Sequence, residues 1–153
     1  MNELYIDYFF KSAQNTLSQF GICDIEKETF CVKNELIIEN DVIAFIGIVG
    51  SIKGNIAYSF SNKTALSIAS LMVMGMAVES LDDMSRSAIA ELANILTGSA
   101  VCLLSNEATT IDITPPSVLD GKDIFLVLST IKSFSISLKT SVGNIDISIA
   151  IEV

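Results

Sequence analysis

Hydrophobic and polar positions change their spacing several times along the chain, and each change predicts a new element. Apolar residues at near-helical spacing over residues 3–20 predict a first helix, with Gly21 just past its end. A β-like region follows, with credible turns at Asn40-Asp41 and Gly50-Ser51. The strands predicted in this region are residues 29–32, 36–39, 42–49 and 52–60.

The middle of the chain predicts two helices joined by an acidic loop. Ser61 or Asn62 can cap a helix over residues 65–76, whose surface is apolar almost all round, as is typical of a buried helix. This helix is expected to bring three methionines into the core: Met72, Met74 and Met76. A third helix is predicted over residues 82–104, with acidic residues near its start, where the helix dipole favours negative charge.

The last third of the chain is β-like again, because apolar and polar residues alternate along it. Turns are predicted at Asp120-Gly121 and around Val142-Gly143-Asn144, the second of which joins an antiparallel hairpin. The predicted strands are residues 109–113, 124–131, 133–139 and 144–153. The whole pattern predicts an α+β fold, with a mostly antiparallel sheet and helices packed on one of its faces.

Length and composition predict one globular domain, residues 1–153. Half of the residues are hydrophobic and 18% are charged, which excludes a disordered chain. No linker interrupts the pattern, and proline occurs only as Pro115-Pro116. The chain has no histidine, so it cannot build a Ser-His-Asp or Cys-His nucleophile or a histidine-containing metal site. The three cysteines have no metal-binding spacing and are expected to be buried and reduced: Cys23, Cys31 and Cys102.

Charge and hydropathy limit the partners and the location. The formal charge is −9, and Arg86 is the single arginine, so no nucleic-acid partner is expected. The N-terminus carries acidic residues where a signal peptide carries positive charge. The longest uncharged stretches, residues 64–78 and 92–106, have 15 residues each, fewer than the ~20 that span a bilayer. We therefore expect a cytoplasmic protein without a membrane segment.

The third predicted helix has two stripes when its residues are projected at about 100° per residue. The expected core stripe holds Met84, Ala88, Leu92, Ile95, Ser99 and Leu103. The narrow stripe beside it holds Ser87, Glu91, Asn94 and Gly98, with Ala90 just beyond.

The narrow stripe contains two residues that disfavour a helix interior. Asn94 competes for backbone hydrogen bonds, and Gly98 costs up to about 1 kcal/mol relative to alanine. Small residues at Ala90 and Gly98 would let another surface approach, and Glu91 and Asn94 would project into it. A carboxylate suits a lysine or arginine partner, and a carboxamide suits the orientation of a water molecule. An ordinary solvated helix face, with the glycine serving tight internal packing, would explain the same residues.

One segment of this helix resembles the signature of the CheC/CheX/FliY family of chemotaxis phosphatases. That signature is Asp or Ser, three residues, Glu, two residues, Asn, and a proline a little over twenty positions later. Ser87, Glu91 and Asn94 fit it in order, and Pro115 and Pro116 lie 21 and 22 positions after Asn94. Loosely, the resemblance covers most of the chain and implies the CheC-like fold. The single copy of the signature is typical of the CheX members.

The resemblance implies an enzyme that accelerates hydrolysis of the aspartyl phosphate on a CheY-type response regulator. Asn94 would hold a water in line with phosphorus, and Glu91 would dock to a lysine of the receiver domain. Ser87 would lie at the contact edge, and Pro115 or Pro116 would shape the loop beside the helix. From the projection, and not from the family, we expect Gly98 and Ala90 to give the partner clearance; they and Ser87 are the expected partner-binding residues.

The resemblance further implies a homodimer, a role in chemotaxis, and no metal or cofactor in this chain, with Mg²⁺ held by the receiver domain. Two alternatives stay open. One is a non-catalytic receiver-binding or dimerisation module of a chemotaxis or flagellar-switch assembly. The other is a structural dimerisation domain or a sensor of a small apolar ligand, which the low charged fraction allows.

Overall fold

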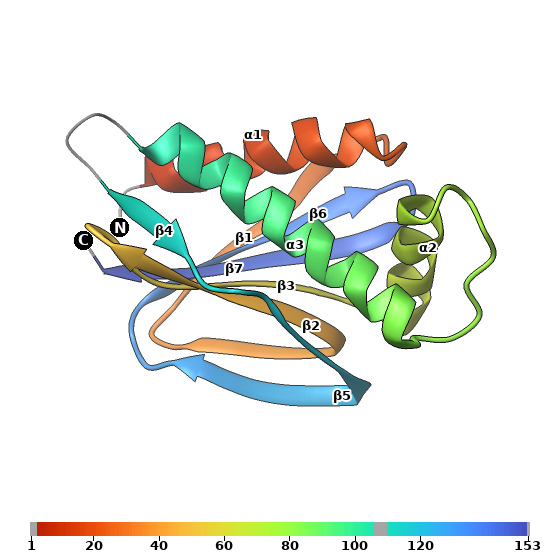
Figure 1. Cartoon of the computed structure of the whole chain (residues 1–153). Helices are drawn as coiled ribbons and strands as arrows, with labels where there is room; N and C mark the ends of the chain where they lie inside the picture. Colours follow the sequence, from red (N-terminus) through yellow and green to blue (C-terminus); the bar gives the residue numbers. More distant parts are fainter. Residues whose placement is uncertain (1–2, 106–109, 153) are drawn as a thin grey trace.

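The computed structural model describes residues 3–105 and 110–152 and confirms the predicted fold class. In these two ranges three helices accompany a seven-stranded sheet (Figure 1). The helices are α1 (Glu3–Gln19), α2 (Asn62–Met72) and α3 (Asp83–Leu104). The strands are β1 (Glu26–Lys33), β2 (Leu36–Gly50), β3 (Lys53–Phe60), β4 (Ile111–Ile113), β5 (Ser117–Ser129), β6 (Ser133–Thr140) and β7 (Gly143–Glu152). Thr109 and Val153, limits of two predicted strands, lie outside the described residues.

The sheet is antiparallel at every described pairing. Its strand order is β1-β6-β7-β3-β2-β4, and β5 pairs with the first part of β2. Helices α1 and α3 lie side by side over one face of this sheet (Figure 1). The predicted hairpin between β6 and β7 is confirmed, and its turn contains Gly143 with a φ of 117°. Gly21 also lies just past α1 with a positive φ, as the sequence predicts.

Two hydrophobic cores stabilise the sheet from its two faces. The main core fills the space between the sheet and the helices, and its strand residues alternate along β7 as Ile145, Ile147, Ile149 and Ile151. A smaller core lies on the other face, where Leu36 and Ile38 of β2 pack with Leu126 of β5. The first half of β2 and its partner β5 therefore curl over the face of the sheet that lacks helices.

The prediction of a turn is wrong at two positions, where the structure has an irregularity inside a long strand. Asn40-Asp41 lies within β2, and Asp120-Gly121 lies within β5, where the pairing register shifts. The Asp41 carboxylate accepts the backbone N–H groups of Asn62 and Asp123, and these bonds lower its pKa. Local turn-forming residues thus mark bulges here, because the strands continue on either side through ladder hydrogen bonds.

Two predictions about burial are also wrong. Helix α2 ends at Met72, and Met74 follows in a left-handed conformation with 96% of its surface exposed, while Met76 is also exposed. The Gly75 N–H closes this helix end on the Ser70 carbonyl, so the chain leaves the core before the last two methionines. The three cysteines are exposed rather than buried.

Helix α3 is long and apolar enough, by length and composition alone, to cross a bilayer. Its 22 residues have a mean hydropathy of 1.6 over the most apolar 18-residue window. The fold accounts for this apolar character, because α3 packs against α1 and the sheet through eight buried residues.

The start of α3 is fixed by an N-cap. The Asp82 carboxylate accepts the backbone N–H and the hydroxyl of Ser85, each at 2.9 Å. Ser85 is fully buried and also lies within hydrogen-bond distance of the Ser80 carbonyl. The two bonds from Ser85 lower the pKa of Asp82, because they stabilise the charged carboxylate.

This cap predicts an acid-dependent loss of stability. The lowered pKa means that Asp82 contributes stability above its unfolded pKa of about 3.9 and loses it as pH falls through the folded value. We expect the free energy of unfolding of Asp82→Asn, which keeps an acceptor oxygen, to fall less than that of the parent between pH 5 and pH 2. Of the two carboxyl groups with a lowered pKa, Asp41 and Asp82, only Asp41 still titrates in this variant. Urea unfolding across that range measures this, with Asp83→Asn as control. Equal pH dependence in parent and Asp82→Asn would contradict it.

Candidate functional site

Helix α3 faces the sheet with different residues from those the sequence predicts. Of the expected core stripe Leu92 is buried, whereas Met84 and Leu103 are about half exposed. The buried residues of α3 are Ser85, Ile89, Leu92, Ala93, Leu96, Thr97, Ala100 and Val101. The small members of this set, among them Ala93 and Ala100, let the helix approach the strands closely. Met84, Ile95 and Leu103 keep part of their surface exposed.

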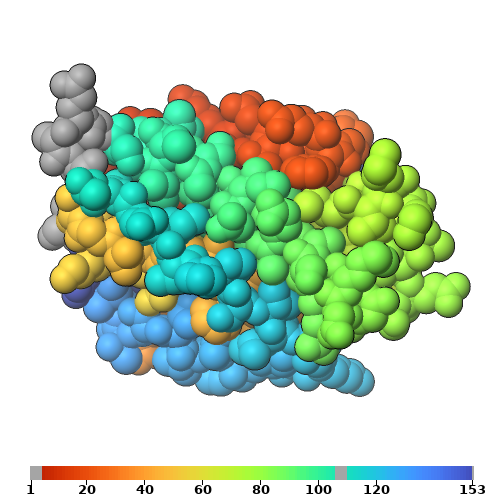
Figure 2. Space-filling view, viewed as in Figure 1, coloured from red at the N-terminus to blue at the C-terminus, as the bar shows by residue number. Residues whose placement is uncertain are grey.

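This orientation places the predicted functional stripe on the outside of the molecule. Ser87 and Glu91 are exposed, and Asn94, Gly98 and Ala90 are partly exposed. We call Ser87, Glu91, Asn94 and Gly98 the α3 ridge. Figure 2 shows α3 lying across this face of the molecule.

The polar side chains of the ridge are available to a partner. The ion pairs within the described residues are Lys27–Asp7 and Arg86–Asp120, which leave Glu91 unpaired there. The Asn94 carboxamide makes no hydrogen bond within the described part of the chain, and no buried polar side-chain atom there lacks a partner. The carboxamide of Asn94 therefore meets solvent, and burial in the core does not explain its place in the helix.

Gly98 is not required by packing within the chain. A Cβ atom built at Gly98 has no other atom within 4 Å, so alanine would fit there. The glycine therefore lowers the stability of α3 without an internal benefit. This removes tight internal packing as the explanation for Gly98 and favours clearance for an approaching surface.

Apolar side chains with exposed surface lie beside the ridge on α3. Met84 is about half exposed, Ile95 is partly exposed, and Cys102 is exposed four positions after Gly98. Exposed apolar groups around a few polar ones are typical of a protein-binding surface. The projection of the sequence placed Met84 and Ile95 in the core stripe, so it did not predict this feature.

The segment between β4 and β5 runs beside α3 and carries both prolines (Figure 1). The Gly47 N–H donates to the Thr114 hydroxyl at 2.8 Å, and the Thr114 N–H donates to the Gly47 carbonyl at 2.9 Å. A side chain at Gly47 would press on Thr114 at 3.0 Å, so the glycine permits this approach. The two bonds fix the segment just before Pro115, which is exposed, and Pro116, which is partly exposed.

A further contact joins the first turn of α3 to the sheet. Arg86 Nη2 lies 2.6 Å from Asp120 Oδ1, and both side chains keep some solvent exposure. Asp120, predicted as a turn residue, thus contacts α3 from within β5. The pair holds the beginning of the ridge against β5.

The first helix does not offer a second ridge of the same kind. A second signature ending at Asn15 would need a glutamate at position 12, where the chain has Ser12. Ser12 is buried and donates its hydroxyl to the Leu96 carbonyl of α3 at 3.2 Å. Lys11 and Asn15 are exposed on α1. Helix α1 therefore supports α3.

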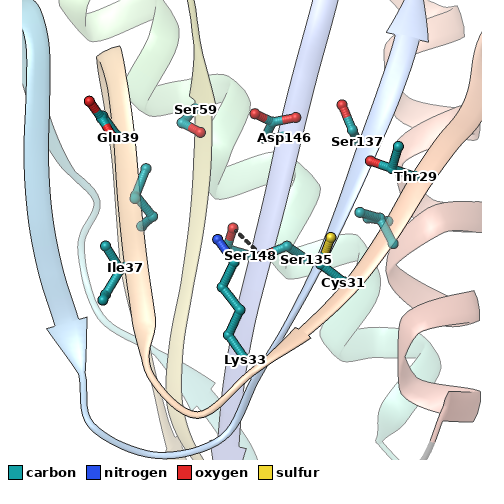
Figure 3. A pocket seen from close by; sticks show the side chains of 12 residues that line it. Thr29, Cys31, Lys33, Ile37, Glu39, Ser59, Ser135, Ser137, Asp146 and Ser148 are labelled. Atoms are coloured by element: carbon teal, nitrogen blue, oxygen red, sulfur yellow. Dashed lines mark hydrogen bonds between the residues drawn. The ribbon is translucent and has the colours of Figure 1, made fainter.

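A groove of about 330 Å³ lies on the other face of the sheet (Figure 3). Its lining includes Asp146 and several hydroxyl groups, among them Ser135 and Ser148, which are hydrogen-bonded at 2.9 Å. The residues predicted for the site do not line this groove. Among the described residues, no three His, Cys, Asp or Glu side chains are grouped as metal ligands.

The arrangement on α3 can bind and orient, but it offers no nucleophile of its own. A carboxylate and a carboxamide stand one turn apart on a rigid helix, with space at Gly98 and apolar contacts around them. Such a surface can dock a cationic group and hold a water molecule near a reactive group that a partner supplies.

Comparisons with known proteins show the family of the chain and its fold. The sequence profile of the family Chemotaxis phosphatase CheX matches residues 42–139. A CheY-P phosphatase CheX from Thermotoga maritima is 40% identical over 106 residues, which are 69% of this chain and 65% of that protein. The chain belongs to the CheX family of chemotaxis phosphatases. The matched segment thus spans slightly less than two thirds of that relative.

Solved structures share the fold along the whole chain. A CheC-like superfamily protein from Shewanella sp. PV-4 has a TM-score of 0.87 and 27% identity, with full coverage of both chains. A CheX from Borrelia burgdorferi, solved in a complex with CheY, BeF₃ and Mg²⁺, has a TM-score of 0.75 and 22% identity, and covers 97% of this chain and 98% of its own. The predicted CheC-like fold is confirmed.

Proposed function

We propose that this protein accelerates hydrolysis of the aspartyl phosphate on a CheY-type response regulator. The observation that carries the proposal is the outward α3 ridge, where Glu91 and Asn94 project beside a glycine that internal packing does not need. The phosphatase relative at 40% identity and the CheX–CheY complex of a structural neighbour support the same partner class.

In this proposal the protein positions a water molecule and the receiver domain supplies the reactive group. Asn94 enters the receiver's active site, and its carboxamide holds a water in line with phosphorus. The water oxygen bonds to phosphorus, the bond from phosphorus to the aspartyl oxygen breaks, and inorganic phosphate and a free aspartate remain. Mg²⁺ belongs to the receiver, and this chain contributes no metal ligand or nucleophile.

The other ridge residues dock the receiver. Glu91 pairs with the receiver's lysine near the phosphoryl group, which fixes the register of α3 in the complex. Ser87 contacts the receiver at the edge of the interface. Gly98 and Ala90 give it clearance, and the Pro115–Pro116 segment shapes the surface beside the helix.

Substitution at the ridge separates chemistry from docking. We expect Asn94→Ala to reduce dephosphorylation to the receiver's own rate with little change in binding, because it removes the group that orients the water. Glu91→Ala weakens both, because the docking ion pair is lost. Phosphate release from the phosphorylated receiver and titration with the beryllofluoride-activated receiver measure the two effects.

Asn15→Ala, which removes an exposed carboxamide from α1, is the matched control and is expected to behave as the parent. A phosphatase rate in Asn94→Ala equal to the parent's would disprove the role of Asn94. Binding of the activated receiver without faster phosphate release by the parent protein would instead favour the non-catalytic receiver-binding module.

Gly98→Ala tests whether Gly98 gives the receiver room to approach α3. The free energy of unfolding and the affinity for the receiver should change in opposite directions. We expect the free energy of unfolding to rise by about 0.5–1 kcal/mol, since alanine favours the helix and its Cβ meets no atom. Receiver binding should weaken at the same time, because the methyl group fills the clearance. Urea unfolding and receiver titration measure the pair, and Ser67→Ala in α2 is the control. Unchanged binding would exclude clearance at Gly98.

We further propose that the protein is a cytoplasmic homodimer whose subunits meet along β5. Within the described residues β5 pairs with β2 alone, which leaves its other edge free. Phe125 is 63% exposed and Val127 is 50% exposed on this strand. An apolar edge strand favours pairing with another chain.

A charged residue on β5 should break this dimer. We expect the parent chain to have about twice its 16.4 kDa monomer mass in solution and Phe125→Lys to be monomeric. Light scattering after size exclusion measures the mass. Val32→Lys, on exposed β1 at the other side of the sheet, is the control and should remain a dimer. A parent monomer, or a dimer of Phe125→Lys, would rule out this interface.

A further inference from the structure

A buried chain of hydrogen bonds connects the sheet to the part of α3 that carries Asn94. The Thr97 hydroxyl donates to the Ala93 carbonyl at 2.8 Å, and the Tyr58 hydroxyl of β3 lies 2.9 Å from the Thr97 oxygen. Because the Thr97 proton is committed to Ala93, Tyr58 is the donor to Thr97. Burial raises the pKa of Tyr58 above its ordinary value, so the phenol remains a donor.

The surroundings of this chain are apolar. Tyr58 is 2% exposed and Thr97 fully buried, and the neighbours that α3 places against the sheet include Ile89, Leu92 and Leu96. Apolar contact stabilises a helix on a sheet without fixing its direction closely, because the hydrophobic effect is not directional. Small side chains such as Ala93 offer little resistance to a slight rotation of the helix. A directional hydrogen bond resists such a rotation.

The hydrogen bonds act at the turn that matters for the site. Thr97 lies three residues after Asn94, and Ala93 lies immediately before it, so both belong to the same stretch of α3. The Ser12 hydroxyl of α1 donates to the Leu96 carbonyl in this stretch from a second side. Contacts from β3 and α1 therefore converge behind Asn94.

A small rotation of α3 would have a large effect on the ridge. A side-chain tip about 6 Å from the helix axis moves about 2 Å when the helix rotates by about 20°. Displacement of a positioning group by about 1 Å can reduce a rate by about a hundredfold. Docking through several contacts along α3 is less sensitive, because no single atom must lie in line with phosphorus.

We infer that Tyr58 and Thr97 are positioning residues, which fix the rotation of α3 and thereby the direction in which Asn94 presents its carboxamide. This inference rests on the proposed phosphatase function. The two residues touch neither the receiver nor the water, and they act through the backbone of α3. Loss of their hydrogen bond reduces the rate of the chemical step more than the affinity for the receiver.

Variants at both ends of the bond separate positioning from stability. We expect Thr97→Val and Tyr58→Phe to reduce kcat about tenfold, with receiver affinity within about twofold of the parent. Thr97→Ser retains the hydroxyl and should retain kcat. The double variant Tyr58→Phe with Thr97→Val removes both partners, so it should regain most of the stability that each single change costs, yet keep the low kcat.

The outcomes are distinct. A kcat that recovers together with stability in the double variant, or a parental kcat in Thr97→Val, would overturn the positioning role. Residual dipolar couplings of the α3 amides report the rotation without any assay of activity and should change in Thr97→Val but not in Thr97→Ser. If the parent protein does not hydrolyse the phosphorylated receiver, the proposed function fails, while the couplings still decide whether Thr97 fixes the helix.

Discussion

Ala93, Thr97 and Ala100 face the sheet, and their small side chains let α3 lie close to the strands beneath it. Because this side of α3 packs on the sheet, the opposite side faces solvent. The exposure of Glu91, the access to Asn94 and the apolar rim around them all follow from this contact. The prolines and Arg86 then shape the surroundings of a ridge that is already in place.

A rigid ridge suits a protein that contributes geometry to a reaction. The chain has no histidine, and its described residues form no metal-ligand cluster, whereas its polar ridge groups are held on a 22-residue helix with a fixed N-cap. Positioning of a water needs little chemical reactivity but an accurate direction. The buried hydrogen bonds behind Asn94 and the Asp82 cap at the helix start supply direction that apolar packing alone does not.

Much of the fold was predictable where one physical signal dominated. Strict alternation of isoleucines over residues 145–151 identified a strand with one buried face, and Gly143 marked its hairpin. Prediction failed where local signals were ambiguous. Asn40-Asp41 has turn-forming residues but lies at a bulge, because β5 pairs with β2 on both sides of it. Projection of α3 misplaced the core stripe: it included Met84, which is half exposed, and left out Ile89 and Leu96, which are buried. Apolar residues occur on more than one side of this helix, so periodicity alone does not choose the buried side.

The amino-acid sequence alone determined the order of the elements, the class of the fold and the spacing of Ser87, Glu91 and Asn94 on one helix. These properties depend on local periodicity, which a linear chain carries in full. The tertiary structure decided that this stripe faces solvent, that Gly98 has open space, and that Tyr58 meets Thr97 from a distant strand. Such facts depend on contacts between residues far apart in the chain, and periodicity within one helix does not contain them.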